Sequence, residues 1–174
     1  MTGDRVLLTL ATLAFAAGVS LLMLRGWRSR QRRQADVPPP PRPPADPGPP
    51  VTEPVRGVFV GTTSAADWLD RIAVHGLSTR AAATLTVHET GVLVARDGAD
   101  DLWLPYDDVL DAESGDALAG KVVGRDGLLI VTWRLGDRTL LSGFRGPRSA
   151  HPALAEAVRA RLPLRPALPR EEAP

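Results

Sequence analysis

Residues 128–144 read LLIVTWRLGDRTLLSGF and form the clearest β-hairpin pattern in this chain of 174 residues. Two apolar, β-branched runs, residues 128–135 and 139–144, flank the pair Gly136-Asp137, which suits a two-residue turn with positive φ. Successive side chains of a strand point to opposite faces of a sheet, so one face of the first run is expected to be buried. The residues on that face are Leu129, Val131, Trp133 and Leu135.

Shorter segments upstream of this hairpin show the same two-residue alternation between turn residues. They are residues 57–62, 84–88, 92–95, 102–104 and 109–112. Downstream the period changes to three and four, with Ser149 placed as a helix cap, Pro152 in the first turn, and Leu154 and Val158 on one face. The pattern predicts a mainly β domain of about seven antiparallel strands, with one C-terminal helix that covers the open end of the sheet.

The predicted domain covers residues 56–162, and residues 163–174 are expected to be a disordered tail. Between Arg56 and Arg161 there are twelve basic and fourteen acidic residues, a net charge of about −2. Nucleic-acid binding is therefore disfavoured, because it needs a dense basic face. The chain has no cysteine, which removes disulfides, zinc–thiolate sites and thiol nucleophiles together.

An uncharged apolar run over residues 6–24 follows a short N-terminus, residues 1–5. As a helix these nineteen residues span roughly 28 Å, close to the hydrocarbon core of a bilayer. The basic segment that comes next, residues 25–36, carries Arg25, Arg28, Arg30, Arg32 and Arg33. Such arginines are a topology signal, and they predict a single-pass helix in the cell membrane with the N-terminus outside and the C-terminal domain in the cytoplasm. The alternative, a cleaved secretory signal, would need its positive charges before the apolar run.

A proline-rich linker is predicted over residues 37–55, since ten of the eighteen residues 37–54 are proline. Such a stretch lacks the backbone donors and apolar side chains that a core requires. As polyproline II, at about 3.1 Å per residue, it would hold the domain as far as roughly 55 Å from the bilayer. An SH3-type ligand is the alternative, because the prolines near Arg42 have suitable spacing.

Nothing in the sequence predicts a catalytic or cofactor site. The histidines, none of which stands at metal-ligand spacing from another, are His75, His88 and His151. Residues 115–121 have the G-x-x-x-x-G-K spacing of a phosphate-binding loop, but Val122 replaces the hydroxyl residue that holds magnesium. A turn into a strand is the preferred interpretation. Asp100-Asp101 is interpreted as a solvated turn. We therefore expect a protein that is not an enzyme and holds no metal or cofactor.

Several stretches resemble one family. They are residues 67–77 (DWLDRIAVHGL), 119–123 (AGKVV), 131–134 (VTWR) and 143–145 (GFR). These stretches are similar to the membrane-anchored bacterial PH-like domain proteins of high-GC Gram-positive bacteria, over the anchor and all of the folded domain. The resemblance implies a PH-like, seven-stranded barrel of two bent sheets plugged by the helix, and no established activity. Leu141-Ser142 departs from the Asp-Thr pair expected before Gly143.

Residues 67–77 lie between the first two predicted strands, where phosphoinositide-binding PH domains carry a basic loop. Here the loop is acidic and apolar, and its candidate partner-binding residues are Trp68, Leu69 and Ile72. Two interpretations stay open: these side chains pack as a short helix against the barrel, or they form an exposed patch for a partner protein. Arg145 and Arg148 are weaker candidates for contacts with an anion or a lipid.

Two functional classes follow from these features. The first is a membrane-anchored, non-catalytic module that binds an unidentified membrane or cytoplasmic protein. The alternative is a domain that senses lipid or the membrane surface, or an accessory component of an export or transport complex. The mild net acidity of the domain favours the first class, because an anionic leaflet repels an acidic domain.

Overall fold

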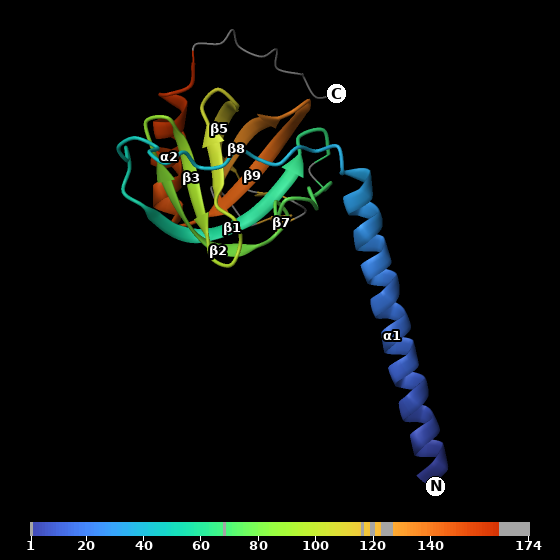
Figure 1. Ribbon diagram of the computed structural model, residues 1–174. Helices are drawn as coiled ribbons and strands as arrows, with labels where there is room; N and C mark the ends of the chain where they lie inside the picture. The colour runs from blue at the N-terminus through green and yellow to red at the C-terminus, as the bar shows by residue number, and fades with distance from the viewer. Residues whose placement is uncertain (1, 68, 116, 119–120, 123–126, 164–174) are drawn as a thin grey trace, which may run out of the picture. The chain divides into compact units, whose positions relative to one another are not determined.

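The computed structural model describes residues 2–67, 69–115, 117–118, 121–122 and 127–163. The chain divides into two compact units between Asp36 and Val37. The first unit contains the helix α1 (Thr2–Arg33), and the second contains the strands and the helix α2 (His151–Arg159) (Figure 1).

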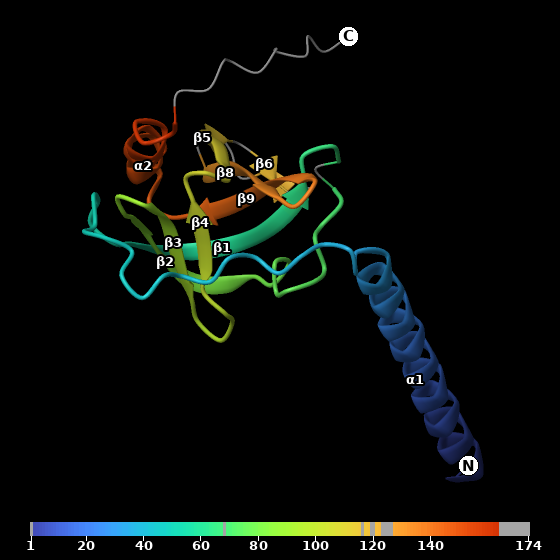
Figure 2. The ribbon, with the colours of Figure 1, turned by 45° about the horizontal axis from the view of Figure 1, so that its top comes forward.

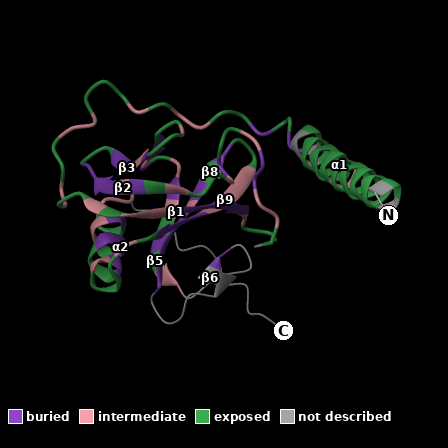
Figure 3. Ribbon diagram, turned by 90° about the horizontal axis from the view of Figure 1, so that it is seen from below, coloured by how far each residue is buried: buried purple, intermediate pink, exposed green. Residues whose placement is uncertain are grey.

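The helix α1 is longer than the predicted apolar run and continues through most of the basic segment. Most of its residues are exposed (Figure 3), and they include the large apolar residues from Val6 to Leu24 other than Val19. The hydroxyls of Thr9, Thr12 and Ser20 each donate to the carbonyl four residues earlier, so the polar side chains of the run are satisfied within the helix. The part from Arg5 to Ser29 is long and apolar enough to cross a membrane.

Seven antiparallel strands form one bent sheet in the second unit (Figures 1 and 2). They are β1 (Val55–Ser64), β2 (Ala81–Val87), β3 (Gly91–Arg96), β4 (Leu102–Pro105), β5 (Val109–Gly115), β8 (Leu128–Leu135) and β9 (Arg138–Arg145). Their order in the sheet is β4-β3-β2-β1-β9-β8-β5. This bent seven-stranded sheet with one C-terminal helix confirms the predicted fold class. Its two halves are continuous, because β1 is long enough to pair with β2 through its first half and with β9 through its second.

The β8–β9 hairpin confirms the pattern of residues 128–144. Trp133 pairs with Leu140, and the turn is made by Gly136, whose φ of 59° favours glycine. The face predicted to be buried is buried, and its residues are Leu129, Val131, Trp133 and Leu135. The opposite face begins buried too, because Leu128 and Ile130 form a second apolar cluster with Val60 and Leu118.

The segment with phosphate-loop spacing contains two short paired strands, β6 (Ala117–Leu118) and β7 (Lys121–Val122). A strand therefore begins at the lysine, where a phosphate-binding loop would begin a helix. This agrees with the predicted turn into a strand.

The C-terminal helix α2 confirms its predicted position but not its predicted cap. A 3₁₀ turn, Arg148–Ala150, precedes it, and the N-cap is Ala150 with no side-chain hydrogen bond. Ser149 is not the cap, because it lies inside that turn; Pro152 is in the first helical turn as expected. The buried residues of α2, which pack against β5 and β8, are His151, Leu154, Ala155 and Val158.

Residues 37–54, which we call the proline strap, lie against the domain and do not form a separate linker. Figures 1 and 2 show this segment in blue to cyan as it crosses the domain before β1. Val37 is only 2 % exposed and belongs to the main core cluster. The folded unit therefore begins at residue 37, and the predicted domain boundary at residue 56 is corrected to that position.

Candidate functional site

The proline strap is held by hydrogen bonds to its carbonyl oxygens. Proline has no backbone N–H, but its carbonyl still accepts, so the donors must come from the domain. His75 Nε2 donates to Val37 O at 2.8 Å, and His88 Nδ1 donates to Gly48 O at 2.8 Å. Thr90 Oγ1 donates to Pro47 O at 2.7 Å.

The end of the strap joins the sheet through its own backbone donor. The N–H of Val51 donates to Val87 O at 2.7 Å, and Pro50 forms a bridge with His88. A chain that is bonded near both of its ends and buried at Val37 is a part of the domain, because each of these contacts would be lost if it stood away as a spacer.

Arg96 joins the end of β3 to the loop between β1 and β2. Its side chain is 5 % exposed, Nε donates to Asp100 O at 2.7 Å, and Nη1 donates to Gly76 O at 2.9 Å. The guanidinium lies 5.0 Å from the centre of the Phe59 ring, a cation–π distance. Burial lowers the pKa of Arg96, while the nearby carboxylates of Asp100 and Asp101 raise it. These contacts hold the buried guanidinium of Arg96 beside the exposed carboxylates of Asp100 and Asp101.

A cleft of about 520 Å³ lies between the proline strap and these residues. Residues 39–43 of the strap line it together with His75, Arg96, Asp100 and Asp101. Its wall thus combines proline rings with two carboxylates and with the guanidinium groups of Arg42 and Arg96. Proline rings beside charges of both signs suit an extended peptide.

The loop of residues 65–80 is anchored at a bulge in β1. Gly61 has a φ of 136°, and a Cβ there would lie 2.6 Å from Nη2 of Arg71. That nitrogen donates to Val60 O at 2.7 Å, and Thr62 N donates to Leu77 O at 2.8 Å. The glycine therefore makes room for the guanidinium that holds the loop to the strand.

The candidate partner-binding residues of this loop differ in their burial. Ile72 is 0 % exposed and packs in the main core, whereas Leu69 is 57 % exposed. Trp68 lies outside the described residues. Ile72 is therefore corrected from a partner-binding candidate to a core residue. Of the two interpretations of this loop, packing against the barrel holds for Ile72, but the short helix does not, because the described part of residues 65–80 forms turns and a bridge between Arg71 and Thr63.

The other candidate residues are exposed. Arg145 ends β9 and Arg148 begins the 3₁₀ turn, on either side of Gly146-Pro147. On α1, the side chains of Arg25, Arg28 and Arg32 are exposed.

The cleft was missed by sequence reasoning. Its two walls come from segments more than 30 residues apart, and a proline run carries no period that reveals what it packs against. The one available signal was the pair of isolated valines, Val37 and Val51, at the ends of the strap.

A family model described as bacterial PH domain-like matches residues 37–159. The chain belongs to the bacterial PH domain-like family. The match begins at the first residue of the proline strap and ends at the last residue of α2, so it treats the strap as part of the PH-like domain. It also confirms the resemblance inferred from the residue stretches. None of the curated proteins compared with the chain matches it.

Proposed function

We propose that this protein is a single-pass, membrane-anchored and non-catalytic interaction module, which presents its PH-like domain at the cytoplasmic face. The observation that carries the proposal is the direct connection between the two units. Only residues 34–36 separate an apolar helix of membrane-spanning length from the first residue of the PH-like domain.

The orientation rests on the charges that flank the apolar run. Asp4 and Arg5 offset each other before it, whereas five arginines follow it within residues 25–33. Arginine excess beside a membrane helix favours the cytoplasmic side.

The docked strap sets how far the domain can stand from the bilayer. From Leu24 the chain continues as helix to Arg33, and three further residues lead to Val37. That path reaches at most roughly 28 Å, about half of the reach of a free proline spacer. The domain is thus suited to a partner that is itself in or on the membrane, including a component of a transport complex.

We assign two contact regions to the partner, Leu69 and the cleft beside the proline strap. Leu69 offers an exposed apolar side chain, and the cleft offers proline rings with Asp100 and Asp101. Interfaces combine apolar contacts with a few charged groups in this way. The lipid-sensing alternative is less well supported, since Arg145 and Arg148 alone would have to overcome a net acidic domain.

Single cysteines test the orientation, because the natural chain has none. We expect Gly3→Cys to react with a membrane-impermeant maleimide in whole cells, and Ala82→Cys, exposed on β2, to react only after lysis. Labelling of Ala82→Cys in intact cells would reverse the topology.

Site-specific photo-crosslinking tests the interaction surface in the full-length protein in its own membrane. We expect a crosslinker at Leu69 or Asp100 to yield a discrete protein adduct, and one at Ala82 to yield none. Equal yields from all three exposed positions, or no adduct from any, would refute this binding surface.

A further inference from the structure

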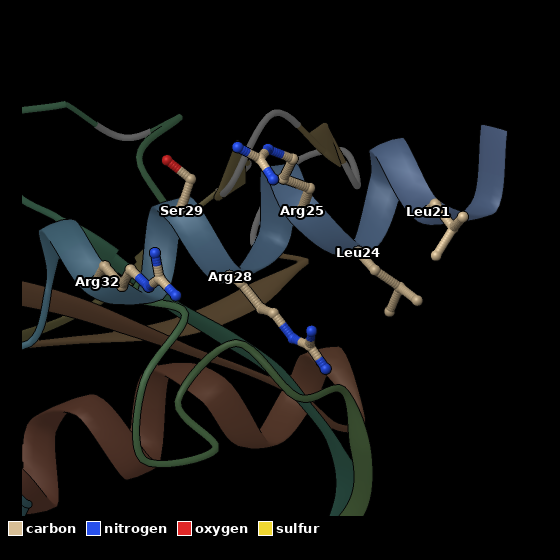
Figure 4. Close-up of a pocket in the computed structure, with 6 residues that line it drawn as sticks. All are labelled: Leu21, Leu24, Arg25, Arg28, Ser29 and Arg32. Atoms are coloured by element: carbon tan, nitrogen blue, oxygen red, sulfur yellow. The ribbon is translucent and has the colours of Figure 1, made fainter. Parts of the chain in front are cut away.

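A groove with both apolar and basic walls lies on one face of α1. Its volume is about 510 Å³, and Leu21, Leu24, Arg25, Arg28, Ser29 and Arg32 line it (Figure 4). These residues follow one another at steps of three and four, from Leu21 to Leu24 and Arg25, then to Arg28 and on to Arg32. Such steps place them along one side of a helix. The leucines come first along the chain and the arginines follow, so apolar surface passes directly into basic surface.

The three guanidinium groups of this face have no carboxylate partner among the described residues. Like charges at such spacing destabilise a helix, and burial in protein does not compensate them, since all three side chains are exposed. A topology signal needs only the number of arginines beside the membrane and not their placement on one face. The shared face is therefore a feature that the topology signal leaves unexplained, and an external anion would offset its charge.

We propose that this face binds an anionic phospholipid, with its phosphate against Arg25, Arg28 and Arg32 and an acyl chain along Leu21 and Leu24. The proposal rests on the insertion of α1 proposed above. In that setting the leucines lie at the depth of the acyl chains and the arginines at the depth of the headgroups. Guanidinium groups bind phosphate through paired N–H donors, and the Ser29 hydroxyl supplies a further donor.

The leucines distinguish a lipid from a free phosphate. A free anion would use only the basic end of the groove, whereas a phospholipid fills both ends at once. Trp27 is exposed in the same helical turn, and an indole at the headgroup level is a common anchor of helix depth. Such an anchor would keep the arginines level with the phosphates.

Full-length protein in bilayers of phosphatidylcholine with a minor share of phosphatidylglycerol tests the proposal. Spin-labelled versions of the two lipids report by electron paramagnetic resonance which one the helix retains. The variant Arg28→Gln with Arg32→Gln removes two charges from the groove. The control, Arg30→Gln with Arg33→Gln, removes two charges from adjacent helix positions, which do not share a face with the first pair.

We expect the groove variant to lower the preference for phosphatidylglycerol by about tenfold, and the control by less than about twofold. Equal losses from the two variants would overturn the proposal in favour of diffuse charge attraction. Full displacement of the labelled lipid by inorganic phosphate would overturn it in favour of an anion site without a lipid.

Flotation of the unmodified protein with the vesicles is measured first. Protein that does not float refutes the proposed insertion, whereas floating protein without a difference between variants refutes only the lipid site.

Discussion

His75 Nε2 donates a hydrogen bond of 2.8 Å to the carbonyl oxygen of Val37, the first residue of the folded domain. His75 has a φ of 54°, a left-handed conformation that costs a non-glycine residue about 1 kcal/mol. Retention of a strained histidine at this position is understandable if its ring is needed to hold the strap. The bond thereby links the loop of residues 65–80 to the first residue of the proline strap.

The docked strap predicts slow hydrogen exchange at Val51. Its amide donates to Val87 O at 2.7 Å, so exchange requires the end of the strap to open. We expect protection of this amide close to that of the strand amides of β2, measured by nuclear magnetic resonance on the full-length chain in detergent. Exchange at the rate of an unstructured peptide would mean that residues 37–54 form a free linker.

Replacement of His75 by alanine should loosen the other end of the strap. The substitution removes the bond to Val37 O but retains the strained backbone, so a net loss of about 1 kcal/mol is expected. A spin label at Ala45→Cys, exposed in the strap, should gain a mobile component in its spectrum. Thr79→Ala, an exposed change in the same loop, is the control and should leave the spectrum unchanged. Identical spectra for all three proteins would show that the bond does not hold the strap.

The sheet was largely predictable from the sequence, because most strands are short apolar or alternating runs that end at a turn residue, although β1 is longer than the predicted residues 57–62. Residues 128–135 were predicted to the residue, since both the apolar alternation and Gly136 mark the limits of β8. The N-cap of α2 was not predicted correctly, because Ser149 fits a capping pattern but lies inside the 3₁₀ turn that precedes the helix. Local patterns fix strands better than they fix which of two neighbouring residues starts a helix.

The candidate site was harder to predict, because its parts meet only in three dimensions. An apolar run such as residues 67–77 has no period to show which side chains turn inward, and the structure buries Ile72 while it exposes Leu69. The strap was mistaken for a linker for a related reason. Composition excludes a proline segment from a sheet ladder, but it does not exclude hydrogen bonds from His75 or Thr90 to proline-segment carbonyls.

Gly61→Ala should destabilise the domain more than an alanine at another glycine with positive φ. The new Cβ would lie 2.6 Å from Arg71 Nη2, so the guanidinium must move away from Val60 O as well as tolerate a strained backbone. We expect a loss of about 2 to 4 kcal/mol in the free energy of unfolding. Gly98→Ala is the control, because its φ of 72° carries backbone strain but no atom lies within 4 Å of the new Cβ. The free energies of unfolding are measured by urea denaturation. Equal losses for Gly61→Ala and Gly98→Ala would show that displacement of Arg71 adds nothing to the cost.

The buried tryptophan of β8 allows a second stability test. Trp133 is 0 % exposed, and its Nε1 donates to Ser142 Oγ at 2.9 Å, which in turn lies 2.7 Å from Thr62 Oγ1. Trp133→Ala should cost about 3 to 5 kcal/mol, because it leaves a large cavity. Ser142→Ala should cost about 1 to 3 kcal/mol, since it leaves the buried indole N–H without an acceptor. Thr132→Ala, on the opposite face of β8, is the control for strand propensity and should cost less than about 1 kcal/mol.

Tyr106 predicts a loss of stability in alkali. Burial raises the pKa of Tyr106 to about 12 from its ordinary value of 10.0, an effect that the positive charge of Arg161 partly opposes, and its hydroxyl donates to His88 O at 2.7 Å. Below the unfolded pKa the phenol is protonated in both states, so its contribution is fully present. Between the two values the unfolded chain releases the proton and the folded chain retains it, so stability falls as pH rises. Two pKa units correspond to a loss of up to about 2.7 kcal/mol across that window.

This alkaline loss can be measured on one group, because the chain has a single tyrosine. The phenolate absorbance of the folded protein should rise with a midpoint near pH 12, and the free energy of unfolding should decline from about pH 10 upward. Tyr106→Phe removes the titrating hydroxyl, so its stability should be lower at neutral pH by about 1 kcal/mol and flatter above pH 10. A phenolate midpoint near 10 in the folded protein would show that the ring is open to solvent. The hydroxyl would then not be held at His88 O, beside the residue that binds the proline strap at Gly48.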